Sequence, residues 1–458
     1  MAGLNASLAT ALSGLMADQG AIGATANNVS NSNTPGYSRE VPVLVTSDPV
    51  VVGPLTLGTG VTLKTIQSVR DPILESRIQQ ETQDQGQYSA MVDALEQLQV
   101  SFSGNAGDIG TAISKFFDSV NQLSTSPADL SLRQNMLTAA GNLASAFNTT
   151  AERLNAQRTN IDASVQQSVG QINQLTRQIA QLNGQITNLE SVGEDAGTFR
   201  DERTQLIDQL SSLVDVAVIP SDNTLTLTTA SGTALVAGQQ SFQLSTAPDA
   251  SGLQHIDSQS GDITTSIVSG QLGGLLQIRD QQIPGIVSQL DTLASSLANA
   301  VNAVQTSGFD LNGNATTGVS LFTPPPAGGT GAAASLSVAI TDPAQIAASS
   351  DGSAGNNGNA EALYALRNQS CVQGETPSGY YSNIVFQVGN AASNAQAEQS
   401  ASSLVLQQLN NQRSSISGVS LDEEAANLVR YQQAYAASAQ IISTINSMMQ
   451  TVINMKSS

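Results

Sequence analysis

The side chains that most often carry catalysis or bind metals are rare in this sequence. The chain has one histidine, His255, and one cysteine, Cys371. They fall short of the four ligands of a structural zinc site, and a Cys–His nucleophile pair would require the fold to bring two distant residues together. The motifs GxxxxGK[ST], HExxH and GxSxG are absent. We therefore expect His255 at the surface and no catalytic or cofactor-binding residues.

One stretch, FDLNGNATTGVSLF, places oxygen-bearing side chains at alternate positions, namely Asp310, Asn312 and Asn314. An EF-hand calcium loop has this spacing, with glycine at its sixth position and glutamate at its twelfth. The sequence has Ala315 and Leu321 at those two positions. A turn at Asn312–Gly313 is therefore the better interpretation, and we predict no metal site.

The charge balance limits the classes of partner. The 458 residues include 16 basic and 36 acidic ones, giving a net charge of −20. A nucleic-acid-binding protein needs cations that face phosphate, so this balance argues against one. The acidic residues Asp201, Glu202 and Asp208 lie in a helical pattern and are interpreted as a solvated face. No run of 18 or more apolar residues is present, so we expect no membrane partner.

The N-terminal segment has the spacing of a helix that packs along one stripe. Apolar residues recur at steps of three, four or seven, which is the heptad period of a coiled coil; they are Leu4, Leu8, Ala11, Leu15, Ile22, Ala26 and Val29. Gly14, Gly20 and Gly23 interrupt the same segment, and each costs about 1 kcal/mol relative to alanine in a helix interior. We therefore expect a helix over 4–29 that folds only against a partner, with Leu4, Leu8, Leu15, Ile22 and Val29 as its seam.

A crowded set of turn residues, ANNVSNSNTPGY, follows this helix at 26–37. Asn27 and Asn28 are suited to a left-handed or capping conformation at a helix end. Pro35 and Gly36 fit the two central positions of a type II turn, the second of which favours glycine. Tyr37 then offers an apolar ring with a polar tip. The pattern predicts that the chain stops, turns and is anchored within about ten residues.

The rest of the chain alternates between helical and extended patterns. Short strands are predicted over 41–69 and 221–270, and loops with short strands over 308–360. Helices are predicted over 72–100, 144–189, 199–214, 284–305 and 391–455. The seam of the last helix comprises Ala425, Leu428, Gln432, Tyr435, Ile442, Ile445, Met449 and Val452. The 144–189 seam alone would give roughly 69 Å of continuous helix.

These patterns predict an elongated α+β protein with discontinuous helical domains. The first and last helices each have a seam and no neighbour in sequence, so the simplest packing pairs them. The expected domains are a terminal coiled coil (1–30 with 425–458), a helical domain (31–220 with 271–307 and 361–424) and a β-rich outer domain (221–270 with 308–360).

Two terminal stretches resemble one protein family. The stretch ANNVSNSNTPGYSRE (26–40) looks like the N-terminal signature of bacterial flagellar rod, hook and hook-associated proteins, and its TPGYSR part resembles most closely the FlgK family. The stretch SGVSLDEEAANLVRYQQAYAASAQIISTINSMMQTVINM (417–455) is similar to the end of the same family. FRDERTQLIDQLSSLVDV (199–216), SGQLGGLLQIRDQQIP (269–284) and FDLNGN (309–314) resemble FlgK segments in the same order.

The resemblance implies a secreted structural protein, not an enzyme, that lies at the hook–filament junction and is exported through the flagellar type III channel. The N-terminus lacks a basic region and a continuous apolar region, so no Sec-type signal peptide is expected. The implied partners are further copies of the chain in a tube, the hook protein, the second junction protein, and an export chaperone at the C-terminal region. The resemblance places Asn27, Asn28, Pro35, Gly36 and Tyr37 at the N-terminal turn. It places Leu428, Tyr431, Tyr435, Ile442 and Ile445 on the C-terminal helix, where the seam continues to Met449 and Val452.

Two other interpretations stay open at the level of sequence. Another flagellar axial protein, such as hook or distal rod, usually carries a different turn and lacks the long 144–189 seam. A secreted coiled-coil adhesin or interaction protein would not need two terminal seams of low helix propensity.

Overall fold

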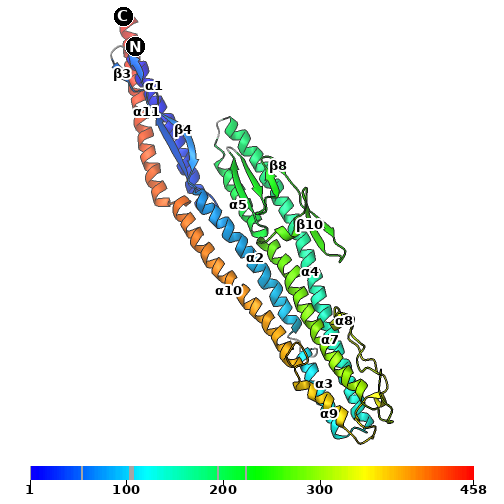
Figure 1. Ribbon diagram of the computed structural model, residues 1–458. Coiled ribbons are helices and arrows are strands. Elements are labelled where there is room, and N and C mark those ends of the chain that lie inside the picture. Colours follow the sequence, from blue (N-terminus) through cyan, green and yellow to red (C-terminus); the bar gives the residue numbers. More distant parts are fainter. Residues whose placement is uncertain (1, 53–54, 103–107, 193–194, 222–223, 458) are drawn as a thin grey trace.

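The computed structural model describes residues 2–52, 55–102, 108–192, 195–221 and 224–457. Figure 1 shows an elongated molecule in which both chain ends lie together at one tip. Helices α1 (Ala2–Asn31) and α11 (Leu421–Ser457) pair along this end, and we call them, together with β1 and β4 defined below, the rod. The remaining long helices run side by side away from the rod and form the bundle. The predicted pairing of the two chain ends is therefore confirmed.

Long helices, several with side-chain caps, build the bundle. Asp129 accepts hydrogen bonds from the backbone N–H groups of Ser131 and Leu132 and so begins the longest helix. Thr376 caps another, which has Pro377 in its first turn. The bundle helices are α2 (Pro72–Phe102), α3 (Ile109–Thr125), α4 (Leu130–Ser191), α5 (Gly197–Leu213), α6 (Gly270–Gln277), α7 (Ile283–Ser307), α9 (Gly358–Ala365) and α10 (Pro377–Ser417).

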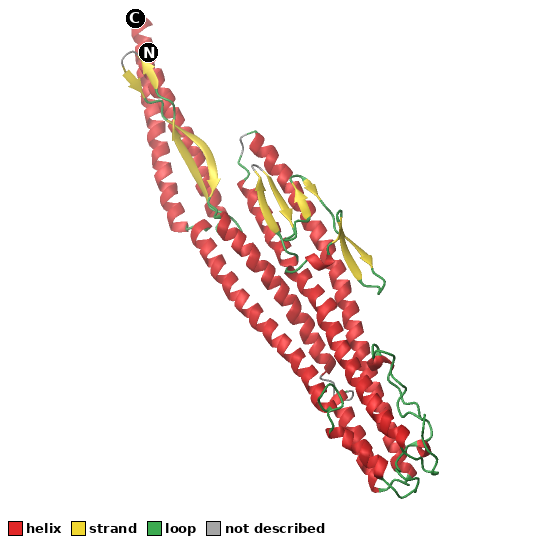
Figure 2. Ribbon diagram, in the orientation of Figure 1, coloured by secondary structure: helices red, strands yellow, loops and turns green. Residues whose placement is uncertain are grey.

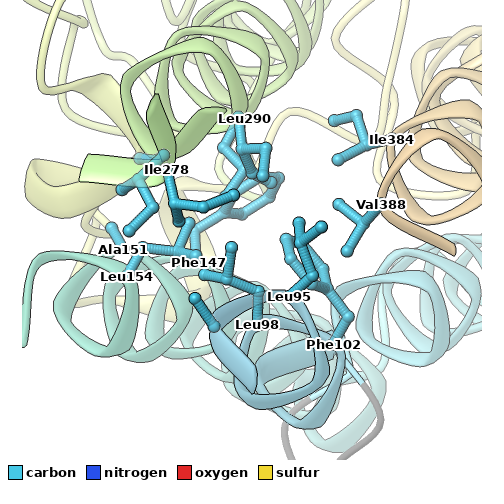
Figure 3. Packing of buried hydrophobic residues seen from close by; sticks show 14 of the residues in the cluster. Leu95, Leu98, Phe102, Phe147, Ala151, Leu154, Ile278, Leu290, Ile384 and Val388 are labelled. Carbon is cyan, nitrogen blue, oxygen red and sulfur yellow. The ribbon is translucent and has the colours of Figure 1, made fainter. Parts of the chain in front are cut away.

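Apolar side chains from the bundle helices fill the core. Figure 3 labels several that come from α2, α4, α7 and α10. Leu98 of α2, Phe147 of α4 and Leu290 of α7 are fully buried, and Ile384 of α10 is 1% exposed. A π-helical turn, η2 (Ile278–Gln282), joins α6 to α7 and adds Ile278 to the same core. The long seam predicted for 144–189 is one continuous helix that extends further toward the N-terminus, to Leu130.

The strands lie outside the helices (Figure 2). Strands β1 (Glu40–Thr46) and β4 (Val61–Ser68) form an antiparallel hairpin against α1, with β2 (Val50–Val52) and β3 (Leu55–Leu57) at its tip. A four-stranded sheet of consecutive strands packs on α4; its members are β5 (Ala217–Ser221), β6 (Thr224–Thr228), β7 (Ala234–Ala237) and β8 (Gln240–Ser241). A three-stranded sheet, which we call the wing, follows with β9 (Ser245–Pro248), β10 (Gln254–Ser258) and β11 (Gly261–Asp262).

The segments 221–270 and 308–360 contact different stretches of α4. Asn183 donates to the backbone carbonyl of Gly238 in the first segment. Asn148 donates to the carbonyl of Ala333, in the short helix α8 (Ala332–Ser335) of the second segment. Residues 222 and 223, inside the predicted β region, lie outside the described part of the chain. The division into three domains stays a proposal, while the elongated α+β fold class is confirmed.

The last predicted helix, 391–455, differs from the structure. Helix α10 begins earlier, at Pro377, and the helix is interrupted at Gly418–Ser420 before α11 begins. A Cβ atom at Gly418 would lie 2.2 Å from the backbone oxygen of Ser414, which explains why glycine stands at this break. The break separates the bundle from the rod.

Candidate assembly interface

Small side chains allow the two rod helices to approach closely. Ala17, Ala21 and Ala24 of α1 are at most 2% exposed. At Gly14, an added Cβ atom would lie 3.4 Å from the Ser438 hydroxyl of α11. Gly14 therefore suits the packing of α1 against α11, and Gly20 lies against Leu63 of β4, whereas Gly23 has no atom within 4 Å of an added Cβ atom.

The predicted seams lie partly within this pairing. Leu4, Leu8, Leu15 and Ile22 of α1 are half-buried, and Val29 is exposed. On α11, Ile445 is buried; Leu428, Tyr431, Ile442 and Met449 are half-buried; Tyr435 and Val452 are exposed. The pairing within one chain thus leaves much of both seams accessible, and their role in assembly stays a proposal.

Each rod helix also has a second stripe that the sequence analysis missed. Exposed residues recur at steps of three and four along α1: Ala9, Leu12, Met16, Gln19, Gly23 and Ala26. Exposed residues recur in the same way along α11: Ala437, Ile441, Thr444, Met448, Thr451 and Met455. Met16 is 61% exposed and Met455 is 75% exposed. Heptad spacing of exposed apolar residues is typical of a helix that lacks a partner, and a search for a second heptad register could have found it.

The turn after α1 has the predicted shape. Gly36 has φ +77°, and the backbone N–H of Tyr37 donates to the Thr34 carbonyl at 3.2 Å. This is the hydrogen bond of a β-turn with glycine at its third position. The side-chain amide of Gln205, on α5, donates to the Pro35 carbonyl. The turn, α5 and the end of α10 line a groove of about 630 Å³.

Asn27 and Asn28 do not cap the helix, and that prediction is wrong. Helix α1 continues to Asn31, and both residues have ordinary helical backbone because their side chains find partners in the following strand. The Asn27 amide donates to Oε2 of Glu40 at 3.0 Å. The Asn28 amide oxygen accepts from the Tyr37 hydroxyl and from the Glu40 backbone N–H, each at 2.8 Å. Tyr37 is therefore anchored as predicted, with Asn28 as its partner.

A buried carboxylate at the start of α11 completes this cluster. Glu424 is 2% exposed, and its Oε2 accepts from the Asn28 amide nitrogen at 3.1 Å. Its Oε1 accepts from Nε of Arg39 at 2.9 Å, while Nη1 of Arg39 pairs with the exposed Glu423 at 2.8 Å. Burial, reinforced by the nearby carboxylates, raises the pKa of the Tyr37 phenol above its usual value.

The interpretation of Asp201 as part of a solvated face is wrong. Asp201 is 6% exposed, because the segment after the turn packs over α5. Its carboxylate accepts from the backbone N–H of Ser38 at 3.0 Å and from the Ser38 hydroxyl at 2.7 Å, and it pairs with Arg70. Asp208, two turns further along α5, is also partly covered, and its burial raises its pKa to about 7. Glu202 is exposed, as predicted.

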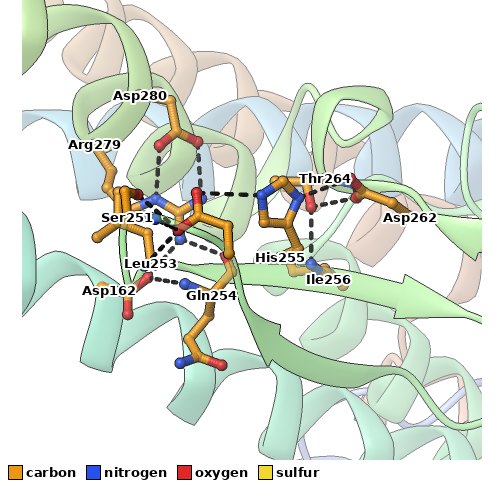
Figure 4. A network of polar contacts seen from close by, with 11 residues as sticks. Asp162, Ser251, Leu253, Gln254, His255, Ile256, Asp262, Thr264, Arg279 and Asp280 are labelled. Carbon is orange, nitrogen blue, oxygen red and sulfur yellow. Dashed lines mark hydrogen bonds and ion pairs between the residues drawn. The ribbon is translucent and has the colours of Figure 1, made fainter.

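The residues considered above as candidates for catalysis or metal binding lie apart from the rod. His255 is part of the wing, where its side chain is 41% exposed and its Nδ1 lies 2.7 Å from Oδ2 of Asp262 (Figure 4). The Asp262 carboxylate raises the pKa of the imidazole. The Asp310 carboxylate accepts from the backbone N–H groups of Asn312 and Asn314, and Gly313 has φ +75°, so the predicted turn is confirmed. Cys371 is a free, half-buried thiol.

The described residues contain no cluster of three or more His, Cys, Asp or Glu side chains arranged to hold a metal ion. Among the helices described, none has the length and apolar character needed to cross a membrane.

Comparison with known proteins gives a consistent result along the chain. Residues 95–322 match a family model described as the flagellar hook-associated protein FlgK helical domain. Residues 8–37 match the flagella basal body rod protein model, and residues 410–455 match the C-terminal model of the flagellar basal body rod FlgEFG protein. Flagellar hook-associated protein 1 of Escherichia coli (strain K12) is 27% identical, covering 97% of this chain and 99% of that protein. The protein of the same name from Bacillus subtilis (strain 168) is 28% identical over 98% and 97%.

This chain belongs to the FlgK family. A solved FlgK structure, titled as the flagellar hook junction protein from Burkholderia pseudomallei, shares the fold at a TM-score of 0.66 and 19% identity. The alignment covers 74% of this chain and all of that one. The family comprises structural proteins of the flagellum, and membership implies an extracellular flagellar location and assembly with other flagellar components. The chain is accordingly a structural hook-associated junction protein of the FlgK type, and the adhesin interpretation is not favoured.

Proposed function

We propose that this FlgK-family chain polymerises as a tubular layer at the hook tip and so joins hook to filament. One observation carries the mode of assembly: both rod helices have an exposed heptad stripe in addition to the contact they make with each other. Burying a methionine or leucine side chain contributes about 1.5–3 kcal/mol. A contact in which neighbouring copies cover both stripes would therefore be substantially stabilised.

The two stripes differ in composition, which favours contact between unlike surfaces. The α1 stripe contains Gly23 and two alanines, whereas the α11 stripe has Ile441, Met448 and Met455. Long side chains of one copy can therefore lie over the small residues of the next copy. A contact between two different faces repeats from copy to copy and closes into a ring or continues as a helical tube.

We further propose which residues form the tube, which proteins lie next to it and how the protein is exported. Residues 1–30 with 425–458 form the inner-tube domain, and the seams Leu4 to Val29 and Leu428 to Val452 contribute to lateral packing. The hook protein lies below the layer and the second junction protein above it. The protein leaves the cell through the flagellar type III export channel, with an export chaperone at its C-terminal region.

The test is polymerisation of stripe variants. Met448→Asp and Met16→Asp place a charge in the proposed contact without touching the bundle. We expect both variants to remain monomeric under conditions where the unaltered protein forms tubes, measured by sedimentation and electron microscopy. Phe386→Asp, at a 64%-exposed position on α10, is the matched control and should polymerise.

Polymerisation of both stripe variants would overturn the proposed contact. The place in the flagellum is tested separately by deleting the gene. Hooks that lack filaments are expected, whereas loss of the hook itself would favour another axial protein.

A further inference from the structure

The angle between rod and bundle is not set by the main apolar core. That core extends over the bundle and the sheets packed on it, and the buried residues that form it include no residue of α1 or α11. The chain passes between bundle and rod through Gly418–Ser420 and through residues 69–71, which join β4 to α2. Such connections alone would leave the rod free to swing.

A polar cluster lies where these connections meet, and it is anchored on both sides. Ser38 binds Asp201 of the bundle helix α5. The next residue, Arg39, donates its backbone N–H to the Ser417 carbonyl at the end of α10 at 2.8 Å, and its side chain binds Glu424 of α11. Two consecutive residues therefore connect α5, α10 and α11.

The members of this cluster depend on one another. Asn28 is 1% exposed and uses its full amide capacity, because its oxygen accepts two hydrogen bonds and its nitrogen donates to the Glu40 carbonyl and to Glu424. Each oxygen of the Glu424 carboxylate has one partner, either Asn28 or Arg39. When a buried carboxylate or amide loses a hydrogen-bond partner, its desolvation is no longer offset, and the folded state is destabilised.

We propose that Asn28, Tyr37, Arg39, Glu40 and Glu424 form a latch that locks the rod to the bundle at one angle, with the contacts of Ser38 to Asp201 and of the Arg39 backbone to Ser417 as its anchors on the bundle. The latch also couples the two chain ends, because the last turns of α1 stay ordered only when the first turn of α11 supplies Glu424. The turn motif after α1 thus acts within one chain as a positioning element, in addition to any contact between copies.

Hydrogen exchange of the full-length protein tests the coupling. Glu424→Gln keeps the size of the side chain and removes its charge. We expect backbone amides of residues 20–31 in α1 to exchange about tenfold faster or more, although the mutation is in α11. Glu423→Gln is the matched control, because Glu423 is the preceding residue and binds the same Arg39 but is 61% exposed. It should change these rates by less than about twofold, as is usual for a surface ion pair.

Several outcomes would overturn the latch. They are equal effects of Glu424→Gln and Glu423→Gln, an effect of Glu424→Gln confined to α11, and unprotected 20–31 amides in the unaltered protein. Amides of residues 136–154 in α4 report on folding and should be unchanged in both variants.

A distance measurement tests the fixed angle. Spin labels at the exposed positions Gln440 and Glu96, in a Cys371→Ser background, span rod and bundle. We expect one narrow distance distribution that broadens in Glu424→Gln and stays narrow in Glu423→Gln. A broad distribution in the unaltered protein, or one that Glu424→Gln leaves narrow, would show that the latch does not hold the angle.

Discussion

Gly36 lies directly against Gln205, which is 169 positions further along the chain. A Cβ atom at Gly36 would come within 2.4 Å of the Gln205 side-chain nitrogen, and the φ of +77° at Gly36 disfavours every L-residue. A side chain at this position would therefore require the Gln205 side chain to move away from the turn.

Gly36→Val should lower the free energy of unfolding by at least about 1–3 kcal/mol, the usual cost of backbone strain, with the clash against Gln205 added. Urea unfolding of the purified protein measures this, and filament attachment in cells should also be impaired. Gly252→Val is the control, since Gly252 has φ +86° and nothing within 4 Å of the added Cβ atom. Equal costs at the two positions would mean that the contact with Gln205 contributes nothing.

Asp215→Asn should stabilise the protein at neutral pH. Asp215 is fully buried, its Oδ1 has no hydrogen-bond partner among the described residues, and burial raises its pKa from 3.8 to about 6. Folding therefore favours the protonated form: the cost of the charge is absent below about pH 4 and grows as the pH rises through 6. Two pKa units correspond to about 3 kcal/mol.

Urea midpoints of the Asp215→Asn variant at pH 4 and pH 7.5 measure this difference. The gain should appear at pH 7.5 and vanish at pH 4. Asp93→Asn, at an exposed position on α2, is the control and should show no gain at either pH. A gain of equal size at both values would assign the effect to something other than the charge.

Arg279→Met should detach the wing from the bundle. Arg279 is 2% exposed; its Nη1 donates to Asp162 of α4 at 2.6 Å and to the Gln254 carbonyl of β10 at 2.8 Å (Figure 4). Removing the guanidinium leaves Asp162 buried with an unpaired charge, at a cost of about 3–5 kcal/mol. Thermal unfolding and hydrogen exchange of residues 245–258 report the loss. Adding Asp162→Asn should recover part of it, and a double variant as unstable as the single one would contradict this assignment.

The pKa of the single histidine, His255, reports whether its ion pair with Asp262 forms in the wing. Because Asp262, and more weakly Asp249, favour the protonated imidazole, the pKa of His255 is raised above 6.5. The stabilisation it gives the wing is fully present below pH 6.5 and is lost as the pH rises through the raised value. In a proton NMR titration, the Cε1 proton of this imidazole should shift with a midpoint above pH 6.5. Asp262→Asn should move that midpoint down, and an unchanged midpoint would show that the 2.7 Å contact does not form in solution.

The sequence by itself determined the elements that depend on local patterns. Heptad spacing determined the helices at both chain ends and the seam of α4, because helix periodicity is visible in consecutive residues. Pro35 and Gly36 determined the turn, since the third position of a type II turn needs a positive φ, which favours glycine. The terminal motifs determined the family, which the comparisons confirmed along the chain.

Only the tertiary structure decided which polar residues are buried. Asp201 and Glu424 look like ordinary charged residues on helix surfaces, and their partners Ser38, Asn28 and Arg39 are more than a hundred positions away. The spacing of a helix shows which residues share a face, but it does not show what will cover that face. Burial of a charge depends on a partner that the folded chain brings from elsewhere, and for that reason the buried roles of Asn28, Asp201 and Glu424 were not predictable from their neighbours in sequence.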